Sequence, residues 1–496
     1  MSLFDFFRVG KAAASPPSAR PRLLIKPLGK AFAAASDDRL NYSWRAANIS
    51  ADEELVRSLD KLRGRSRDLA QNNEYAKKFL QMCVTHIVGQ NGFRLQSQVF
   101  EGDKPDLLAR QWIENAFWKW SQRGVCEVSG RYSFAELQRQ LVRAVARDGE
   151  ALVRIWREPG TADPFQLQLI EIDRLPTTLN DYSRAGNRVV MGIEMDAKGR
   201  PLNYYINPGT LTTPRYEPIP ATDIIHLYDP ERPEQHRGLP WMHAIMSGLK
   251  MLSGFEESAV VAARAGASKM GFFTSPDGNV APLADAQEAG EFFTEADPGQ
   301  FGVLPPGYEF QSFNPDYPNG NFDGFVKSRL RGIASGLGVA YHTLASDLEG
   351  VNFSSARAGT LEERDNWMVR QNWFIEAFLI PVFKTWLFSA MKAGDLKTPS
   401  GQPLPFNKYD KFVEHSWQGR RWQWVDPLKD IEAARLAIKT GIASPKSIAA
   451  QTGVDLEDIL PEIAQFEAMV AANNLSLIDY NLTPQPPEPK EEVAEK

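Results

Sequence analysis

The chain of 496 residues contains only two cysteines, Cys83 and Cys126, and they form no CxxC pair. This excludes a disulfide-rich scaffold and fits a reduced compartment. The sequence also lacks an uninterrupted apolar run of the ~20 residues that span a bilayer. Its first residues lack the apolar stretch of a secretory signal, because Asp5 interrupts the aromatic residues there. We therefore expect a protein made inside the cell, with no membrane partner.

Motifs of the common catalytic and metal-binding chemistries are missing as well. There is no G-x-x-x-x-G-K-[ST] loop, which argues against an ATP-driven motor, and there is no H-E-x-x-H. The six histidines are not paired at metal-ligand spacing, and His226 lies in an alternating strand pattern that favours a satisfied core residue. The glycines at 332, 336 and 338 follow a helical pattern and indicate a helix end. The sequence predicts no metal and no cofactor.

Two short motifs supply an enzymatic alternative. Ser247-Gly-Leu-Lys250 is an S-x-x-K and Lys439-Thr-Gly441 is a K-T-G, as in penicillin-recognising serine enzymes. That chemistry needs the serine at a helix start and the K-T-G on a strand edge. Here the pattern places Ser247 inside a helix predicted over 239–267 and the K-T-G at the end of another helix. We therefore predict no catalytic residues, and a serine hydrolase using Ser247 and Lys250 is the alternative.

The composition is that of an ordinary globular protein with an acidic balance. Hydrophobic residues make up 43% of the chain and charged residues 24%, and the formal net charge is −6. Tight binding of nucleic acid rests on Lys and Arg that neutralise phosphates, so the balance argues against a protein that grips DNA. At this length the chain has ample sequence for sizeable cores and several domains.

The strongest pattern is a long helix entered through a small polar loop. Apolar residues recur at spacings of three and four between residues 354 and 392. Ser354 or Ser355 is the expected N-cap and Gly394 the stop. Such a helix would measure on the order of 55–60 Å, and Pro381 should kink it. The acidic residues around the loop are expected to form an acidic rim rather than a metal or acid–base cluster: Asp347, Glu349, Glu362, Glu363 and Asp365.

The remaining chain mixes helices with a β-rich region, which makes the predicted fold class α+β. The period changes to two between residues 150 and 228, where short alternating runs are separated by Pro, Gly and Asn. Five basic residues between Arg57 and Arg67 lie within a predicted helix, a pattern typical of a solvated face. Helices are expected over 53–88, 105–121, 132–148, 239–267, 322–337, 426–440, 445–452 and 455–473.

Seven collinear stretches, spread over about residues 40 to 475, resemble the lambda-type phage portal proteins. They include "RGRSRDLAQNNEYAKKF" with "IVGQNGFRLQ" (63–96), "RDGEALVRIW" (147–156) and "LQLIEIDRL" (167–175). The others are "GIEMDAKGRPLNYYI" (192–206), "IPATDIIHLYDPERPEQHRGLPWM" (219–242), "SARAG" (355–359) and "WVDPLKDIEAARLAIKTGIASPKSIAAQTGVD" (424–455).

The resemblance implies a portal fold with clip, stem, wing and a mainly helical crown, whose subunits form a ring, usually of twelve. It places a disordered basic N-terminal arm at 1–39, a first wing segment with a leading stem segment at 40–164, a β-rich region including the clip at 165–228, a stem helix at 239–267, a second wing segment at 268–344, a channel loop and long kinked helix at 345–393, a connecting loop at 394–425, a helical crown at 426–475 and a disordered acidic tail at 476–496.

The implied function is conduction of double-stranded DNA, without sequence preference, through the ring at one capsid vertex during packaging and ejection. Implied partners are the other subunits, the terminase large subunit, the major capsid protein and scaffold, and a head–tail connector or neck protein. The implied location is the virion, after assembly in the host cytoplasm. Another head or neck structural protein without a DNA channel is the second alternative.

Candidate DNA-facing residues are those of the loop and of the helix start behind it. Asp347 and Glu349 would repel phosphate, and any basic contact would come from the arginines. The loop set is Ser346, Asp347, Leu348, Glu349, Gly350, Val351 and Asn352, and the helix-start set is Ser354, Ser355, Arg357 and Arg364.

Overall fold

The computed structural model describes a large part of the chain between residues 43 and 472. It divides into residues 1–50 and a compact unit, Ala51–Lys496, and the fold below is that of the second unit. The arm predicted at 1–39 and the tail predicted at 476–496 lie outside the described residues. The described ranges are 43, 48–158, 164–209, 215–267, 271–274, 309–312, 321–350, 352–398, 401–422, 426–453 and 456–472.

Helices form the N-terminal part of this unit. The single helix predicted over 53–88 is divided at Asn73, whose side chain accepts a hydrogen bond from the Ala76 N–H at 2.9 Å and so starts a second helix. A capping box of Ser133 and Glu136 starts a further helix. The elements are α1 (Ala51–Asn72), α2 (Glu74–Cys83), the π-helical turn η2 (Val84–Val88), α3 (Leu107–Trp120) and α4 (Phe134–Asp148).

The predicted β-rich region forms two antiparallel sheets. One has the order β11-β4-β5 and the other the order β10-β9-β8-β7-β6. One of the alternating runs, "RVVMGIEM" (188–195), is a hairpin, because Met191 (φ 46°) and Gly192 (φ 83°) turn the chain in left-handed conformations. The strands are β4 (Glu150–Arg157), β5 (Phe165–Ile170), β6 (Asp181–Tyr182), β7 (Arg188–Val190), β8 (Ile193–Met195), β9 (Pro201–Ile206), β10 (Glu217–Pro220) and β11 (Ile224–Tyr228).

The segment 394–425, predicted as a connecting loop, contains a strand and a short helix. β14 (His415–Gln418) pairs antiparallel with β1 (Arg94–Ser97), with Arg94 opposite Gln418. A strand of four residues has no recognisable pattern when its partner lies so far away in the sequence. The other short elements are β2 (Phe100–Glu101), β3 (Lys104–Pro105), β12 (Gly271–Thr274), β13 (Glu309–Ser312) and α10 (Tyr409–Phe412).

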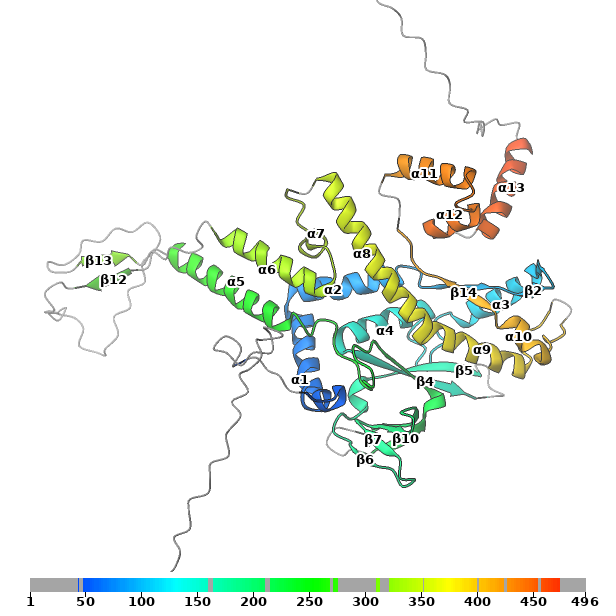
Figure 1. Cartoon of the computed structure of the whole chain (residues 1–496), viewed down its shortest axis with the longest axis horizontal. Coiled ribbons are helices and arrows are strands. Elements are labelled where there is room, and N and C mark those ends of the chain that lie inside the picture. Colours follow the sequence, from blue (N-terminus) through cyan, green and yellow to red (C-terminus); the bar gives the residue numbers. More distant parts are fainter. Residues whose placement is uncertain are drawn as a thin grey trace, which may run out of the picture. The chain divides into compact units, whose positions relative to one another are not determined.

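The predicted long helix is present as one bent rod (Figure 1). It consists of α8 (Phe353–Phe374), the π-helical turn η5 (Ile375–Leu379) and α9 (Ile380–Ala393). The kink expected at Pro381 follows this turn, where the Ile380 N–H bonds to the Ile375 carbonyl. Gly394 ends the helix in a left-handed conformation, as predicted. The N-cap prediction was wrong, because Asn352 caps the helix by accepting the Ser355 N–H at 2.8 Å.

One helix of the described residues, Arg357–Ala393, is long and apolar enough to cross a membrane by length and composition. The sequence reading missed it because Glu376 and Lys384 interrupt the apolar run. Half of its most apolar window is buried inside the protein.

Apart from the short helix Tyr341–Ala345, which was not predicted, the remaining helices agree with their predictions except at one start. The helix expected from residue 239 begins at Met246, after a series of turns. Gly338 ends α6 in a left-handed conformation (φ 69°), as its spacing predicted. Ser444 and Pro445 start α12, and Gly453 ends it. The helices are α5 (Met246–Ala267), α6 (Phe322–Leu337), α7 (Tyr341–Ala345), α11 (Pro427–Lys439), α12 (Pro445–Thr452) and α13 (Leu456–Ala472).

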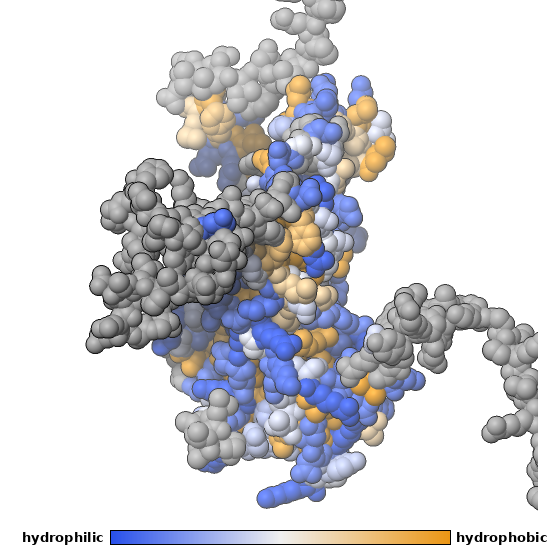
Figure 2. Space-filling model, turned by 90° about the vertical axis from the view of Figure 1, so that its left-hand side faces the viewer, coloured by the Kyte–Doolittle hydropathy of each residue, from blue (hydrophilic) through white to orange (hydrophobic). Residues whose placement is uncertain are grey.

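Aromatic side chains join the distant segments in the larger of two cores. The Phe117 ring of α3 lies 5.0 Å from the Trp386 ring of α9, 5.5 Å from Phe134 of α4 and 5.6 Å from Trp417 of β14, centroid to centroid. The smaller core packs Leu59 of α1 against the five-stranded sheet. The face drawn in Figure 2 is mostly hydrophilic, with separate apolar patches.

Candidate functional site

The predicted channel loop, Ser346–Asn352, is an exposed turn between α7 and α8. Ser346 (φ 54°) and Gly350 (φ 69°) hold left-handed conformations, which bend the chain at both ends. Leu348 is 72% exposed between them. Asn352 fixes the far end as the cap of α8, and Val351 lies outside the described residues. The loop therefore presents its tip to the surroundings while its ends are anchored.

The acidic residues of this loop are joined to a lysine that the sequence reading missed. Lys327 of α6 lies 2.5 Å from Glu349, 2.9 Å from Asp323 and 3.9 Å from Asp347. The Tyr341 hydroxyl donates to Asp347 at 2.7 Å, which lowers the pKa of that carboxyl. Hydrogen bonds to Glu349 and Asp323 raise the pKa of Lys327, so it stays charged. The loop is an ion-paired cluster with an acidic excess, not a bare acidic rim.

Glu363 does not belong to the predicted acidic rim. Its side chain is buried and accepts from the Thr343 hydroxyl at 2.9 Å and from the Trp367 indole N–H at 3.0 Å. It therefore ties α8 to α7. Glu362 and Asp365 remain exposed on α8.

The candidate residues at the start of α8 are engaged within the fold. Arg357 forms an ion pair with Asp430 of α11 at 2.9 Å. The Arg364 guanidinium lies 5.8 Å from the centre of the Trp422 ring, and burial lowers its pKa. Ser355 donates its hydroxyl to the Asn352 carbonyl, and Ser354 lies in the first turn. Both arginines thus connect α8 to the segment that follows β14.

The basic run of α1 is only in part the predicted solvated face, because Arg57, Lys61 and Arg65 are exposed whereas Arg63 and Arg67 are paired within the fold. Arg63 is 3% exposed and forms an ion pair with Glu150, and Arg67 pairs with Asp148 at 2.8 Å and Asp173 at 2.6 Å. These partners lie about 80 to 110 positions further along the sequence. The solvated-face prediction failed for Arg63 and Arg67 because local periodicity cannot identify a partner that is distant in the sequence.

Glu150 is the centre of this buried charge cluster, at the start of β4. Its carboxylate is fully buried and accepts from Arg237 at 2.8 and 3.0 Å and from the Gly238 N–H at 3.1 Å. His226 of β11 lies 2.7 Å away, which confirms it as a satisfied core residue. Burial opposes ionisation, but the two arginines outweigh it and hold the pKa of Glu150 far below its ordinary value.

Arg237 extends the cluster to the five-stranded sheet. Its remaining N–H groups donate to the Met191 carbonyl at 2.6 Å and the Leu175 carbonyl at 3.2 Å. One guanidinium thereby joins the three-stranded sheet to the turn between β7 and β8. The sequence offered no sign of this role, since Arg237 lies in a segment of turns.

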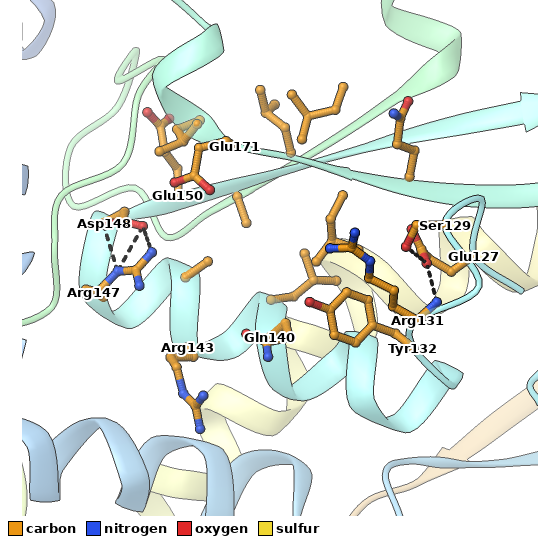
Figure 3. Close-up of a pocket in the computed structure, with 18 of the residues that line it drawn as sticks. Glu127, Ser129, Arg131, Tyr132, Gln140, Arg143, Arg147, Asp148, Glu150 and Glu171 are labelled. Carbon is orange, nitrogen blue, oxygen red and sulfur yellow. Dashed lines mark hydrogen bonds and ion pairs between the residues drawn. The ribbon is translucent and has the colours of Figure 1, made fainter. Parts of the chain in front are cut away.

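A cleft of about 440 Å³ lies between α4 and the outer strand β5 (Figure 3). Its acidic residues are already bonded: Glu127 accepts from Ser129 at 2.6 Å, and Asp148 pairs with Arg147 at 2.6 Å. Arg131 reaches across the cleft in Figure 3. Within the described part of the chain no three His, Cys, Asp or Glu side chains are placed to hold a metal ion.

The residues of the enzymatic alternative do not form the arrangement that their chemistry needs. One ground for rejecting it was wrong, because α5 begins at Met246 and Ser247 lies in its first turn. The other ground is confirmed, since Lys439 is the last residue of α11 and Gly441 follows that helix end rather than a strand edge. Ser247 and Lys250 are both exposed.

Comparison with known proteins gives a consistent result. Residues 37–371 match the model of the family described as phage portal protein, lambda family. A probable portal protein of Halomonas phage phiHAP-1 is 35% identical over 473 residues, which cover 92% of this chain and 90% of the relative. Portal protein B of Escherichia phage lambda is 24% identical over 459 residues, covering 85% of this chain and 86% of the relative.

Among solved structures, a chain in the neck of an empty GTA particle, computed with C6 symmetry, aligns with 84% of this chain. The alignment covers 98% of that chain, with 15% identity and a TM-score of 0.42. The family assignment rests on the two sequence comparisons.

Proposed function

The chain belongs to the lambda family of phage portal proteins, and from this premise we propose that it forms a ring at one vertex of a phage head through which double-stranded DNA enters and leaves. The observation that carries the proposal is the family match together with 35% identity to a relative over nearly the whole chain. The family is structural, so no catalytic role is assigned to any residue. We propose a ring of twelve subunits.

The charge balance supports a conduit that does not hold its DNA. A wall rich in Lys and Arg would bind phosphates strongly at every position along the duplex. The chain has a formal net charge of −6, and several of its arginines are used inside the fold, such as Arg63, Arg237 and Arg357. In a ring of such subunits the negative net charge would oppose adhesion of DNA phosphates and so let the duplex slide.

We assign the Ser346–Asn352 loop to the channel wall. Its exposed tip at Leu348 and its fixed ends suit a segment that touches moving DNA without unfolding. Lys327 restrains Glu349 and Asp347 in one cluster, so the loop can shift as a unit about its two left-handed residues. Phosphate meets acidic and apolar groups there, which weakens adhesion.

The remaining partners follow from the proposed position in the particle. The five-stranded sheet β6–β10 would form the clip, which docks the terminase large subunit during packaging and a head–tail connector or neck protein later. Helix α5 would belong to the stem, and α11–α13 to the crown. The wing would contact the major capsid protein and scaffold, so that the protein functions in the virion after assembly in the host cytoplasm.

Negative-stain electron microscopy of the purified chain, with native mass measurement, tests the proposal. We expect rings with a central hole and a mass near twelve times 55.5 kDa. The same measurement is made after co-expression with the scaffold and major capsid protein of the same phage. Solid particles or a persistent monomer under both conditions would contradict the portal function, and solid head or neck particles would favour a structural protein without a channel.

A further inference from the structure

The C-terminal helical unit, α11–α13 (described over residues 427–453 and 456–472), exposes an unusual amount of apolar surface. Neither α11 nor α12 has a fully buried residue. Large apolar side chains are instead exposed along it: Leu428, Ile431, Leu436, Ile438, Ile442, Leu460, Ile463, Phe466 and Met469. A helix whose apolar face remains open in the single chain requires another surface to cover it.

Two of these helices carry the same apolar stripe. In α11 the residues at positions i, i+3, i+7 and i+10 are Leu428, Ile431, Arg435 and Ile438. This spacing follows one face of a helix and is that of a coiled-coil seam. Leu428 is 70% exposed and Ile431 is 51% exposed, so the stripe of α11 is open.

The corresponding stripe of α13 differs in the sign of its one charge. At the same spacing α13 has Leu460, Ile463, Glu467 and Val470. Leu460 is 55% exposed and Ile463 is 40% exposed. When two such helices lie side by side in the same direction, three apolar layers match and the third position pairs Arg435 with Glu467.

The rest of each helix continues this complementarity. α13 carries Glu462 and Glu467 and has no Lys or Arg, whereas α11 carries Lys429, Arg435 and Lys439 beside the acidic Asp430 and Glu432. The Asp430 carboxylate of α11 is already paired with Arg357. The two stripes are therefore complementary in charge as well as in apolar pattern.

We propose that the α13 stripe of one subunit docks on the α11 stripe of the next copy of this chain, with Glu467 against Arg435. This inference rests on the proposed function, because a heterologous contact that repeats around an axis closes a ring. The two stripes are different surfaces, so each subunit presents its α13 stripe to one neighbour and its α11 stripe to the other. The contact covers the apolar residues of the two stripes, which the single chain leaves exposed.

Charge reversal tests the contact and its direction. The full chain is made as wild type, Arg435→Glu, Glu467→Arg, and the double variant, and the fraction of mass in rings is measured by native mass spectrometry and electron microscopy. Each single variant places like charges in contact at every interface. We expect the concentration at which half the chain is in rings to rise by roughly tenfold or more. The double variant should assemble as wild type does.

Mixing the two single variants separates a contact between copies from one within a chain. In an alternating ring, the unchanged Glu467 of one variant meets the unchanged Arg435 of the other at one interface. At the next interface the two substituted side chains meet, and they again carry opposite charges. The 1:1 mixture should therefore form rings at concentrations at which neither variant alone does. A contact within one chain would not be restored by mixing.

A matched control is Glu432→Arg, an exposed charge reversal on α11 outside the stripe, which should leave ring yield unchanged. The inference would be overturned if both single variants formed rings as readily as wild type, or if their mixture failed to assemble. In either case wild-type rings would still support the proposed function. Absence of wild-type rings with and without the scaffold and capsid protein would instead contradict the proposed function. Far-ultraviolet circular dichroism of each variant checks that the helices are retained.

Discussion

Replacing Arg237 by methionine should loosen the five-stranded sheet from the rest of the unit. The guanidinium is fully buried and makes four hydrogen bonds, two to the Glu150 carboxylate and one each to the carbonyls of Met191 and Leu175. Methionine fills much of the volume but donates nothing. Two buried carbonyls then lose their donor, and Glu150 keeps only Arg63 and His226 as charged or ring partners.

The magnitude follows from the cost of breaking a buried ion pair. Removing one partner of such a pair costs about 3–5 kcal/mol. Because about 1.4 kcal/mol corresponds to a tenfold change in an equilibrium, local opening should become roughly 100- to 4,000-fold more frequent. The slow amides of β7, β8 and β9 should exchange faster by that factor, whereas amides of the larger core around Phe117 should change little.

Hydrogen exchange read by mass spectrometry measures this effect segment by segment. The matched control is Arg232→Met, in the same turn segment, since Arg232 is half-exposed and lies 3.6 Å from the exposed Glu54. A surface pair of this kind contributes up to about 1 kcal/mol, so exchange should change by less than about fivefold. Equal exchange in the two variants would refute the view that Arg237 holds the sheet.

Further predictions concern other positions. Gly238→Ala should destabilise the fold by about 3 kcal/mol or more, because the added Cβ would lie 2.1 Å from a backbone oxygen. Gly254→Ala, whose added Cβ would lie in open space on α5, should stabilise the fold by about 0.5–1 kcal/mol. The free energies of unfolding of the two variants are compared by urea unfolding. Burial lowers the pKa of His86 from 6.5 to about 4. The unfolded chain therefore binds this proton first, so stability is lost as pH falls from 6.5 to about 4, and the thermal midpoint of His86→Gln should fall less steeply over that range. Leu348→Lys adds a cation at the exposed loop tip and should lower the DNA content of heads while ring yield is unchanged, with Leu348→Gln as the control; normal DNA content in the lysine variant would contradict the channel assignment.

The sequence predicted the elements whose signals, periodicity and capping residues, lie within the element or next to it in the chain. Helices α4, α6 and α11–α13 lie where periodicity and capping residues placed them, since a cap and its helix are neighbours in the chain. The long helix and its stop at Gly394 were predicted for the same reason. Its N-cap was misplaced by a few residues, because Asn352, Ser354 and Ser355 are all good capping residues and the sequence does not rank them.

The ion pairs of the candidate site could not be predicted from such local signals. Lys327 pairs with Glu349 across 22 positions, and Arg63 pairs with Glu150 across 87. Whether a charge is solvated or buried depends on such partners, and a helical pattern carries no record of them. The loop was found because it is polar and short, but its ion pairs come from the packing of α6 beside it.

The pairing of β1 with β14 determines when the fold can be completed. Arg94 and Gln418 lie opposite each other although more than 300 residues separate them in the chain. At a synthesis rate of about 5–20 residues per second, β1 leaves the ribosome about 15 to 65 s before its partner strand exists. During that time Trp417 is not yet present to cover Leu95, so Leu95 and the core residues around it are exposed to solvent or to a chaperone. A chain terminated before residue 415 is thereby left with an open strand edge at β1, which can pair with the strands of other chains.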